Sequence, residues 1–173
     1  KHGLIYDTAL FNRLLETDPM AVPAEIIFRS VEIKNEVVKA DPFEKGLRKI
    51  LNFGHTIGHA IESYSLMNDK DPLLHGEAIA IGFICESFLS VRYMGLSKEE
   101  LSIIQTSILK FFPKYKLNKA SFPQLTELMQ NDKKNADGKI NFSLLNKIGQ
   151  CSTDTYCTES DILDSLNYYL ECI

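Results

Sequence analysis

The residues with the strongest chemical character lie in one stretch, Leu47 to Glu62, which reads LRKILNFGHTIGHAIE. Its periodicity predicts a helix, and at about 100° per residue the helix has two distinct faces. One face is apolar and carries Ile50, Phe53, Ile57, Ala60 and Ile61. The polar face, at positions i, i+4, i+7 and i+11, carries Arg48, Asn52, His55 and His59. An ordinary surface helix exposes Lys and Glu on its polar face. The guanidinium, carboxamide and two imidazoles of this polar face are instead suited to binding an anion and a metal.

A third histidine, His75, opens a second helical segment within Leu74-His75-Gly76-Glu77. Neutral imidazoles on neighbouring helices form a natural partial shell for Zn²⁺, which usually takes three protein ligands when it is catalytic. The alternative is that each imidazole is a core histidine with its own hydrogen-bond partner. Three of the four histidines fall between residues 54 and 76, among glycines that allow a ligand to approach closely. Spacing alone leaves both interpretations open.

The segment from His55 to His59 also has the histidine spacing of the H-E-x-x-H zinc peptidases. Thr56 occupies the place of the glutamate that would act as base, and Gly58 weakens the helix, so a peptidase is not expected.

The rest of the polar face could bind phosphate or carboxylate, because Arg48, Asn52 and His59 combine a guanidinium fork, an amide and an imidazole. The competing interpretation is a solvated face on which Arg48 pairs with Glu44 one turn earlier, a common and weak arrangement. Two lysines of a charged loop are either solvated or close over the same anion, namely Lys133 and Lys134.

Several helices are needed to position these groups. Capping, proline and glycine signals predict helices over residues 4–16, 24–39, 47–62, 75–94, 98–112, 122–130 and 158–171. Residues 140–144 alternate like a strand and can pair with residues 153–158. The predicted fold class is therefore mainly α, a multi-helix domain with at most one small β-hairpin.

Two of these helices carry patterns that predict their packing. Residues 24–39 place Ile27, Val31 and Val38 on one side, which is the expected apolar face. Residues 75–94 contain small side chains that let another helix approach closely, so we expect this helix to be buried against the central one. These small residues are Gly76, Ala78, Ala80 and Gly82.

The bulk composition limits the function classes. At 173 residues and 45% hydrophobic, the chain can bury one core, and residues 1–173 are expected to form a single domain. A net charge of −4 without charge runs argues against nucleic acid, and no window suits a membrane span. The chain opens on Lys1 rather than Met, so we expect an excised piece. The cysteines form no C-x-x-C pair and are expected to be reduced thiols of a cytosolic protein.

Taken together, these motifs resemble the 3-dehydroquinate synthase family. The pattern D-P-x-E-x-G-x-R-x-x-L-N-F-G-H-T-x-G-H-A-I-E is matched by residues 41–62, and L-H-G-E-A-I-A-I-G by residues 74–82. The flank K-x-E-V-V-x-x-D at 34–41 and D-K-K-N at 132–135 also fit. The resemblance implies the family's carboxy-terminal domain, with the amino-terminal NAD-binding domain absent from this chain.

The resemblance also implies roles for individual residues. A divalent metal, Zn²⁺ or another such as Co²⁺, would be held by His55, His75 and a Glu expected three residues upstream of Lys1. Catalytic roles would fall to Lys34, Arg48, Asn52 and His59. The substrate-contacting positions would be Lys1, Lys34, Arg48, Asn52, His59 and a lysine of the pair Lys133 and Lys134.

The implied activity is that of an NAD- and metal-dependent phosphate lyase of the shikimate pathway, which supplies chorismate and aromatic amino acids. It converts 3-deoxy-D-arabino-heptulosonate 7-phosphate to 3-dehydroquinate and phosphate, as a cytoplasmic homodimer. The isolated fragment is expected to be inactive. The alternatives are another sugar-phosphate cyclase, a metal-dependent NAD-linked polyol dehydrogenase, and a non-enzymatic helical interaction module.

Overall fold

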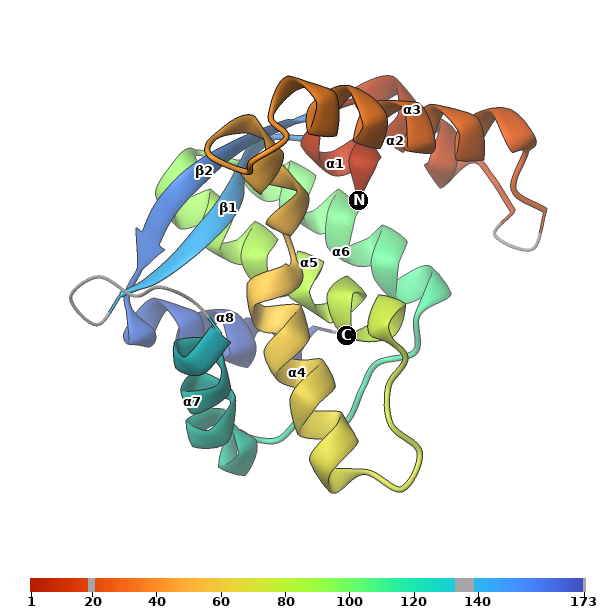
Figure 1. Cartoon of the computed structure of the whole chain (residues 1–173). Coiled ribbons are helices and arrows are strands. Elements are labelled where there is room, and N and C mark those ends of the chain that lie inside the picture. The colour runs from red at the N-terminus through yellow and green to blue at the C-terminus, as the bar shows by residue number, and fades with distance from the viewer. Residues whose placement is uncertain (19–20, 133–138, 173) are drawn as a thin grey trace.

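The computed structural model describes residues 1–18, 21–132 and 139–172, and it confirms the mainly α class. Figure 1 shows a body of helices with a two-stranded antiparallel sheet on one side. The helices are α1 (His2–Ile5), α2 (Thr8–Leu15), α3 (Ala24–Ala40), η1 (Leu47–Asn52), α4 (His55–Asn68), α5 (His75–Met94), α6 (Lys98–Phe111), η2 (Lys119–Ser121), α7 (Phe122–Asp132) and α8 (Glu159–Glu171). The strands are β1 (Ile140–Lys147) and β2 (Gln150–Cys157). Among the described residues, no helix combines the length and apolar character required to cross a bilayer.

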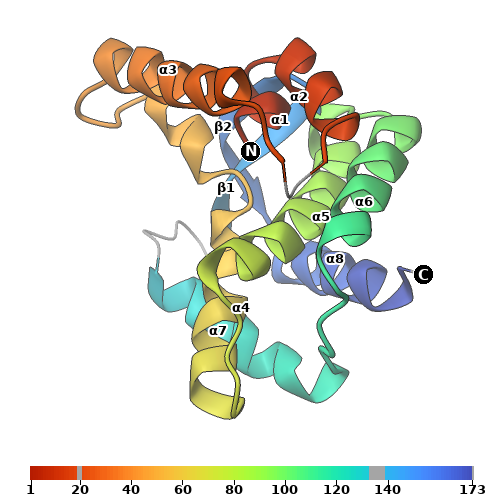
Figure 2. The same cartoon turned by 90° about the vertical axis from the view of Figure 1, so that its right-hand side faces the viewer.

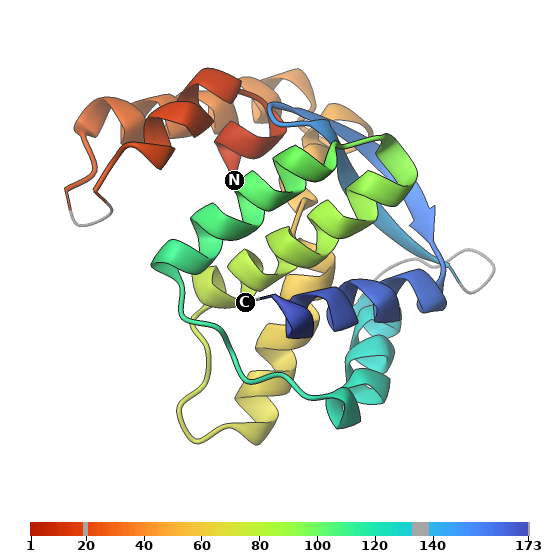
Figure 3. The same ribbon diagram turned by 180° about the vertical axis from the view of Figure 1, so that it is seen from behind.

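Helix α5 forms the centre of the molecule, because it contacts α4, α6, α8 and the hairpin. Figure 3 shows α6 beside α5, with α8 crossing near them. The close approach of α4 that small residues predicted is confirmed. A Cβ added to Gly82 would lie 1.9 Å from the Gly54 carbonyl oxygen, and one added to Gly58 would lie 2.7 Å from Ile79 Cδ1. Backbone therefore meets backbone where α4 and α5 cross.

The remaining helices are grouped at the two ends of the molecule. Figure 2 shows α1, α2 and α3 gathered at one end and α7 beside α4 at the other. The hairpin spans the predicted pairs, from Ile140 opposite Cys157 to Lys147 opposite Gln150, and is longer than expected. Its apolar residues Phe142, Leu144 and Leu145 are buried.

The predicted continuous helix over residues 47–62 is wrong, because the chain breaks between η1 and α4. Phe53 adopts an extended conformation (φ −53°, ψ 130°) and Gly54 a left-handed one (φ +79°), which only glycine reaches without strain. The apolar side chains of the stretch are nevertheless buried, including Ile50, Phe53 and Ile57. Burial was thus predicted correctly, but the geometry that joins the two halves was not.

Two further helix predictions need correction. The expected helix over residues 4–16 is two helices, because the Asp7 side chain accepts a hydrogen bond from the Leu10 N–H at 2.9 Å and caps α2. On α3 the expected apolar face is wrong, since Ile27 and Val31 are exposed. The buried face consists of Ile26, Ile33 and Val37.

The predicted helix signals at the other boundaries are confirmed. Ser97 and Glu100 form the capping box that opens α6, and Gly95 ends α5 in a left-handed conformation (φ +80°). Thr158 caps α8 by accepting from the Asp161 N–H. The loop that contains Lys133 and Lys134 lies outside the described residues.

Candidate metal and anion site

Three imidazoles converge where α4 and α5 begin. His55 is the first residue of α4, His59 follows one turn later, and His75 is the first residue of α5. The ring centroids lie 5.2 Å apart for His55 and His59, 5.9 Å for His55 and His75, and 5.7 Å for His59 and His75. One ligand nitrogen from each ring lies within 4.8 Å of the other two. The described residues therefore contain a cluster that could hold a metal ion.

Hydrogen bonds set the tautomers of two of these rings. Nδ1 of His55 lies 2.9 Å from the Phe53 carbonyl oxygen, and Nδ1 of His75 lies 3.0 Å from Oε2 of Glu62. Both partners are acceptors, so a neutral ring carries its proton on Nδ1 and leaves Nε2 unprotonated. This arrangement, with an acceptor behind the ring, is typical of metal-binding histidines.

The protonation state of His55 suits the same chemistry. Burial of the ring, followed by the nearby charge of Lys1, lowers the pKa of His55 to about 4. The ring is therefore neutral at physiological pH, which is the form that binds metals.

Lys1, which the sequence singled out, lies at the edge of the cluster, and Lys34 is near enough to Lys1 to influence its charge. Nζ of Lys1 donates to the Leu51 carbonyl oxygen at 3.0 Å and lies 3.4 Å from Nε2 of His55. Burial and then the charge of Lys34 lower the pKa of Lys1. Lys1 and Lys34 thus share one region of positive potential, which favours an anionic ligand beside the imidazoles.

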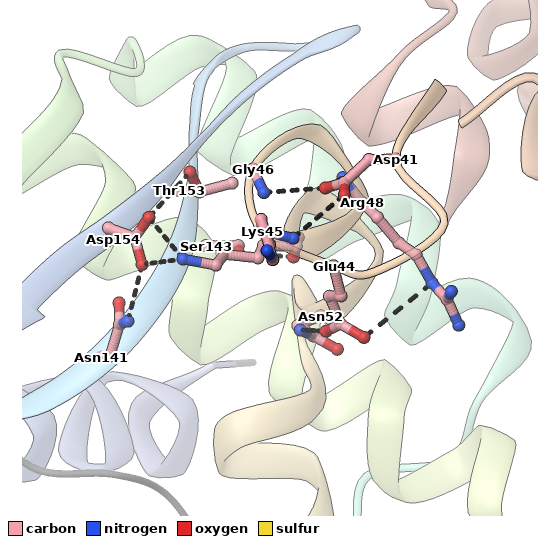
Figure 4. Close-up of polar contacts among 11 residues, drawn as sticks. Asp41, Glu44, Lys45, Gly46, Arg48, Asn52, Asn141, Ser143, Thr153 and Asp154 are labelled. Atoms are coloured by element: carbon pink, nitrogen blue, oxygen red, sulfur yellow. Dashed lines mark hydrogen bonds and ion pairs between the residues drawn. The ribbon is translucent and has the colours of Figure 1, made fainter. Parts of the chain in front are cut away.

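Contrary to the prediction from the sequence, Arg48 and Asn52 do not lie on one helical face with the histidines, because the helix is broken between them. Figure 4 shows both side chains turned to Glu44. Nδ2 of Asn52 donates to Glu44 at 2.7 Å, and Nε of Arg48 lies 3.9 Å from the same carboxylate. Arg48 Nη1 also donates to the Pro42 carbonyl oxygen at 2.8 Å. In this structure the competing Arg48–Glu44 pair is therefore present.

The loop before η1 is held by a carboxylate that sequence reasoning left without a role. Asp41 accepts hydrogen bonds from the backbone N–H groups of Lys45, Gly46 and Arg48 at 3.0, 2.7 and 3.1 Å. These bonds, with that from Lys45 contributing most, lower the pKa of Asp41. Asp41 thus fixes the loop that presents Glu44 and Arg48. Its place in the D-P-x-E-x-G segment was a usable signal, and so was Glu62 at the end of the same motif.

A pocket of about 310 Å³ adjoins the cluster at Lys1 and Gly76. It lies between α2 and α6, and most of its lining is apolar, including Leu14, Phe83 and Phe111. Such a lining does not suit a polyhydroxylated anion. We therefore place the candidate site at the imidazoles and the neighbouring cations, not in this pocket.

Comparison with solved structures identifies the fold. The chain resembles a 2-epi-5-epi-valiolone synthase from Streptomyces hygroscopicus, solved with NAD⁺ and Zn²⁺ bound, with a TM-score of 0.78 and 22% identity over 98% of this chain and 48% of that one. It also resembles a 2-deoxy-scyllo-inosose synthase complexed with carbaglucose-6-phosphate, NAD⁺ and Co²⁺, with a TM-score of 0.68 and 24% identity over 83% and 40% of the two chains. The chain thus has the fold of the matching part of these two synthases.

Sequence comparison identifies the family to which the chain belongs. Residues 1–135 match the model of the 3-dehydroquinate synthase carboxy-terminal domain, so the chain belongs to that family. It is 39% identical to a 3-dehydroquinate synthase of Parabacteroides distasonis, over 99% of this chain and 49% of the relative. A 3-dehydroquinate synthase of Nitrosomonas europaea is 38% identical, over 96% and 46%. The chain spans about half the length of these relatives.

Proposed function

We propose that this chain is the metal- and substrate-binding part of a 3-dehydroquinate synthase, which converts 3-deoxy-D-arabino-heptulosonate 7-phosphate to 3-dehydroquinate and phosphate. The observation that carries the proposal is the convergence of His55, His59 and His75, two of them with Nε2 left as an acceptor. The 38–39% identity to relatives of that name supports the choice of reaction. The NAD-binding domain, the homodimer and the cytoplasmic location are part of the same proposal.

The cluster fits a divalent cation, because three imidazoles converge and the Nδ1 atoms of His55 and His75 are already engaged. His55 and His75 would hold the ion, Zn²⁺ or Co²⁺, with a Glu upstream of Lys1 as third ligand. When bound, the metal would polarise hydroxyl and carbonyl oxygens of the substrate as a Lewis acid, and NAD would accept and return a hydride. Glu62 would keep the His75 ring oriented.

The chain's cations would bind and orient the substrate's phosphate and carboxylate. Lys1 would supply positive charge beside the cluster, and Lys34 would add to it from nearby. Arg48 and Asn52 would exchange Glu44 for a substrate anion. This exchange is feasible, because a partly exposed ion pair contributes only about 0–1 kcal/mol, and a bidentate Arg–phosphate contact is stronger. His59, half-buried in the cluster, would hold or transfer a proton at a substrate oxygen.

The alternatives make different predictions. Another sugar-phosphate cyclase shares the fold and differs in substrate. A polyol dehydrogenase does not require the anion-binding set of Lys34, Arg48 and Asn52, and it accumulates NADH. A helical interaction module does not require two neighbouring imidazoles that both have Nδ1 engaged and Nε2 left as an acceptor, as His55 and His75 have.

A substrate comparison with the full-length gene product tests the proposal. With NAD and Zn²⁺ or Co²⁺, the seven-carbon acid phosphate should yield 3-dehydroquinate and phosphate in equal amounts, without net NADH. Glucose 6-phosphate should not react, and neither should His55→Ala with either substrate. Reaction of glucose 6-phosphate alone would point to another cyclase, and NADH accumulation with a polyol would point to a dehydrogenase. Either result would overturn the proposal.

A further inference from the structure

Glu86 of α5 has a carboxyl group and no exposed surface. A carboxyl group buried in this way is costly unless its oxygens are well hydrogen-bonded. Two backbone N–H groups of another segment supply such bonds. The Gly54 N–H donates to Oε2 at 2.6 Å, and the Ile57 N–H donates to Oε1 at 3.1 Å.

These two donors lie at the start of α4, where a helix leaves its first N–H groups without intrahelical partners. The usual remedy is a side chain at the N-cap position. The N-cap of α4 is Gly54, which has no side chain and whose left-handed conformation excludes most others. Glu86, 32 residues further along the chain, takes over this capping role. Its carboxyl also meets the partial positive charge of the helix amino terminus.

The packing of α5 allows this contact. Gly82 lies one turn before Glu86 on the same face of α5, and its missing Cβ lets the backbone of α4 come close. The Gly54 carbonyl oxygen and the Gly58 nitrogen would both collide with a side chain at this position. Helix α5 thus allows α4 to approach closely at Gly82 and anchors its first turn through the hydrogen bonds to Glu86.

The anchor holds the backbone on both sides of a candidate ligand. Gly54 precedes His55, and Ile57 follows it by two residues. The acceptor for His55 Nδ1 is the carbonyl oxygen of Phe53, directly before Gly54. The orientation of the imidazole therefore depends on the conformation of residues 53–57, which Glu86 fixes.

We propose that Glu86 is a positioning residue for the metal site, capping α4 from α5 so that Nε2 of His55 points to the ion. The inference rests on the metal site of the proposed function. A support of this kind typically changes metal affinity by about 10–100-fold when it is removed. Glu86→Gln keeps the shape but offers one acceptor for two N–H groups. Glu86→Asp keeps both oxygens but withdraws them by one methylene.

The test is a Co²⁺ titration of the full-length gene product followed by absorption, under conditions where each variant is folded by circular dichroism. Glu86→Gln should weaken Co²⁺ binding by about 10–100-fold, and Glu86→Asp by less. Hydrogen exchange of the amides in residues 54–57 should become faster in both variants. Should the glutamine variant fail to fold, the aspartate variant supplies the same comparison.

Ser90→Ala is the matched control, because Ser90 is equally buried on α5, and its hydroxyl accepts from the Leu145 N–H of the hairpin and donates to the backbone carbonyl of Glu86 without touching the Glu86 carboxyl group. It should lower stability and leave Co²⁺ affinity unchanged. Wild-type affinity in the folded Glu86 variants would overturn the inference, as would an equal loss in Ser90→Ala.

His55→Ala separates the two proposals. If it loses Co²⁺ while the Glu86 variants retain it, only the role of Glu86 fails. If it retains Co²⁺, the metal site itself fails.

Discussion

At the residue scale, the chemistry of the site depends on which atoms are already engaged. His55 and His75 come from different helices, and each has an acceptor behind its Nδ1, a carbonyl oxygen in one case and the Glu62 carboxylate in the other. Arg48 and Asn52 are instead held by Glu44, an exposed residue that a stronger anion can replace. The imidazoles are thus arranged in advance, whereas Arg48 and Asn52 would have to release Glu44 before they could bind an anion.

The depressed pKa of His55 predicts a pH dependence of folding. Its pKa falls from 6.5 to about 4 in the folded chain. Between these values the unfolded chain binds a proton at this ring and the folded chain does not, so the free energy of unfolding decreases as the pH falls. Urea denaturation of the chelator-treated protein from pH 7 to pH 4 measures the decline. His55→Asn should show a shallower decline, and an identical profile would contradict the assignment. The lowered pKa of Asp41, from 3.8, adds to this decline at the acidic end of the range and below it, in the wild type and in His55→Asn alike.

Variants of Arg48 test substrate binding separately from metal binding. In the full-length product, Arg48→Ala should retain the metal and the fold while losing on the order of 2–4 kcal/mol in kcat/KM, because a charge-assisted contact to the substrate is removed. Arg48→Lys should recover part of the loss, since a point charge cannot reproduce a bidentate fork. Steady-state kinetics with metal analysis on the same samples provides the measurement. Near-wild-type kcat/KM in Arg48→Ala would mean that the pair with Glu44 is the whole role of this residue.

At the element scale, the position of the site depends on the close crossing of α4 and α5 at Gly54, Gly58 and Gly82. Gly82→Ala should destabilise the chain by at least about 1–3 kcal/mol, because its Cβ would meet backbone atoms that cannot move aside. Gly76→Ala is the control on the same helix, since nothing lies within 4 Å of its added Cβ and alanine favours the helix. Chemical denaturation compares the two. Equal stability of the Gly82 and Gly76 variants would contradict the close crossing.

The sequence predicted most elements and their burial, but not how neighbouring elements meet. Capping and glycine signals located α5, α6 and α8, since these signals act within a few residues. The break at Gly54 was missed, because the apolar pattern continues across it. On α3 the sequence offers two apolar stripes, and only contact with the rest of the fold selects the one containing Ile33.

The candidate site was predictable only in part, because local spacing indicates its histidines but not the residues that contact them from other segments. Histidine spacing brought His55, His59 and His75 to attention, and the structure places their rings together. The contacts Glu44–Asn52, Glu62–His75 and Glu86–Gly54 join residues 8, 13 and 32 positions apart, and no local pattern determines them. The predicted stripe that put Arg48 on one helix with the histidines failed because it assumed an unbroken helix.

At the scale of the whole molecule, this chain accounts for about half the length of its relatives. The proposed reaction also needs an NAD-binding domain and a third metal ligand, both expected outside these 173 residues. The 173-residue chain alone, supplied with NAD and Zn²⁺, should therefore show no synthase turnover, whereas the full-length product should. Product analysis of both preparations is the measurement. Turnover by the isolated chain would show that the site is complete within it.

The proposed function requires that His55 and His75 bind a divalent metal. Elemental analysis of the full-length product, purified and dialysed alongside His55→Ala, His75→Ala and His59→Ala, tests it most directly. We expect stoichiometric metal in the wild type and in His59→Ala, and loss of metal in His55→Ala and His75→Ala with the fold intact. Stoichiometric metal in His55→Ala or His75→Ala would contradict it.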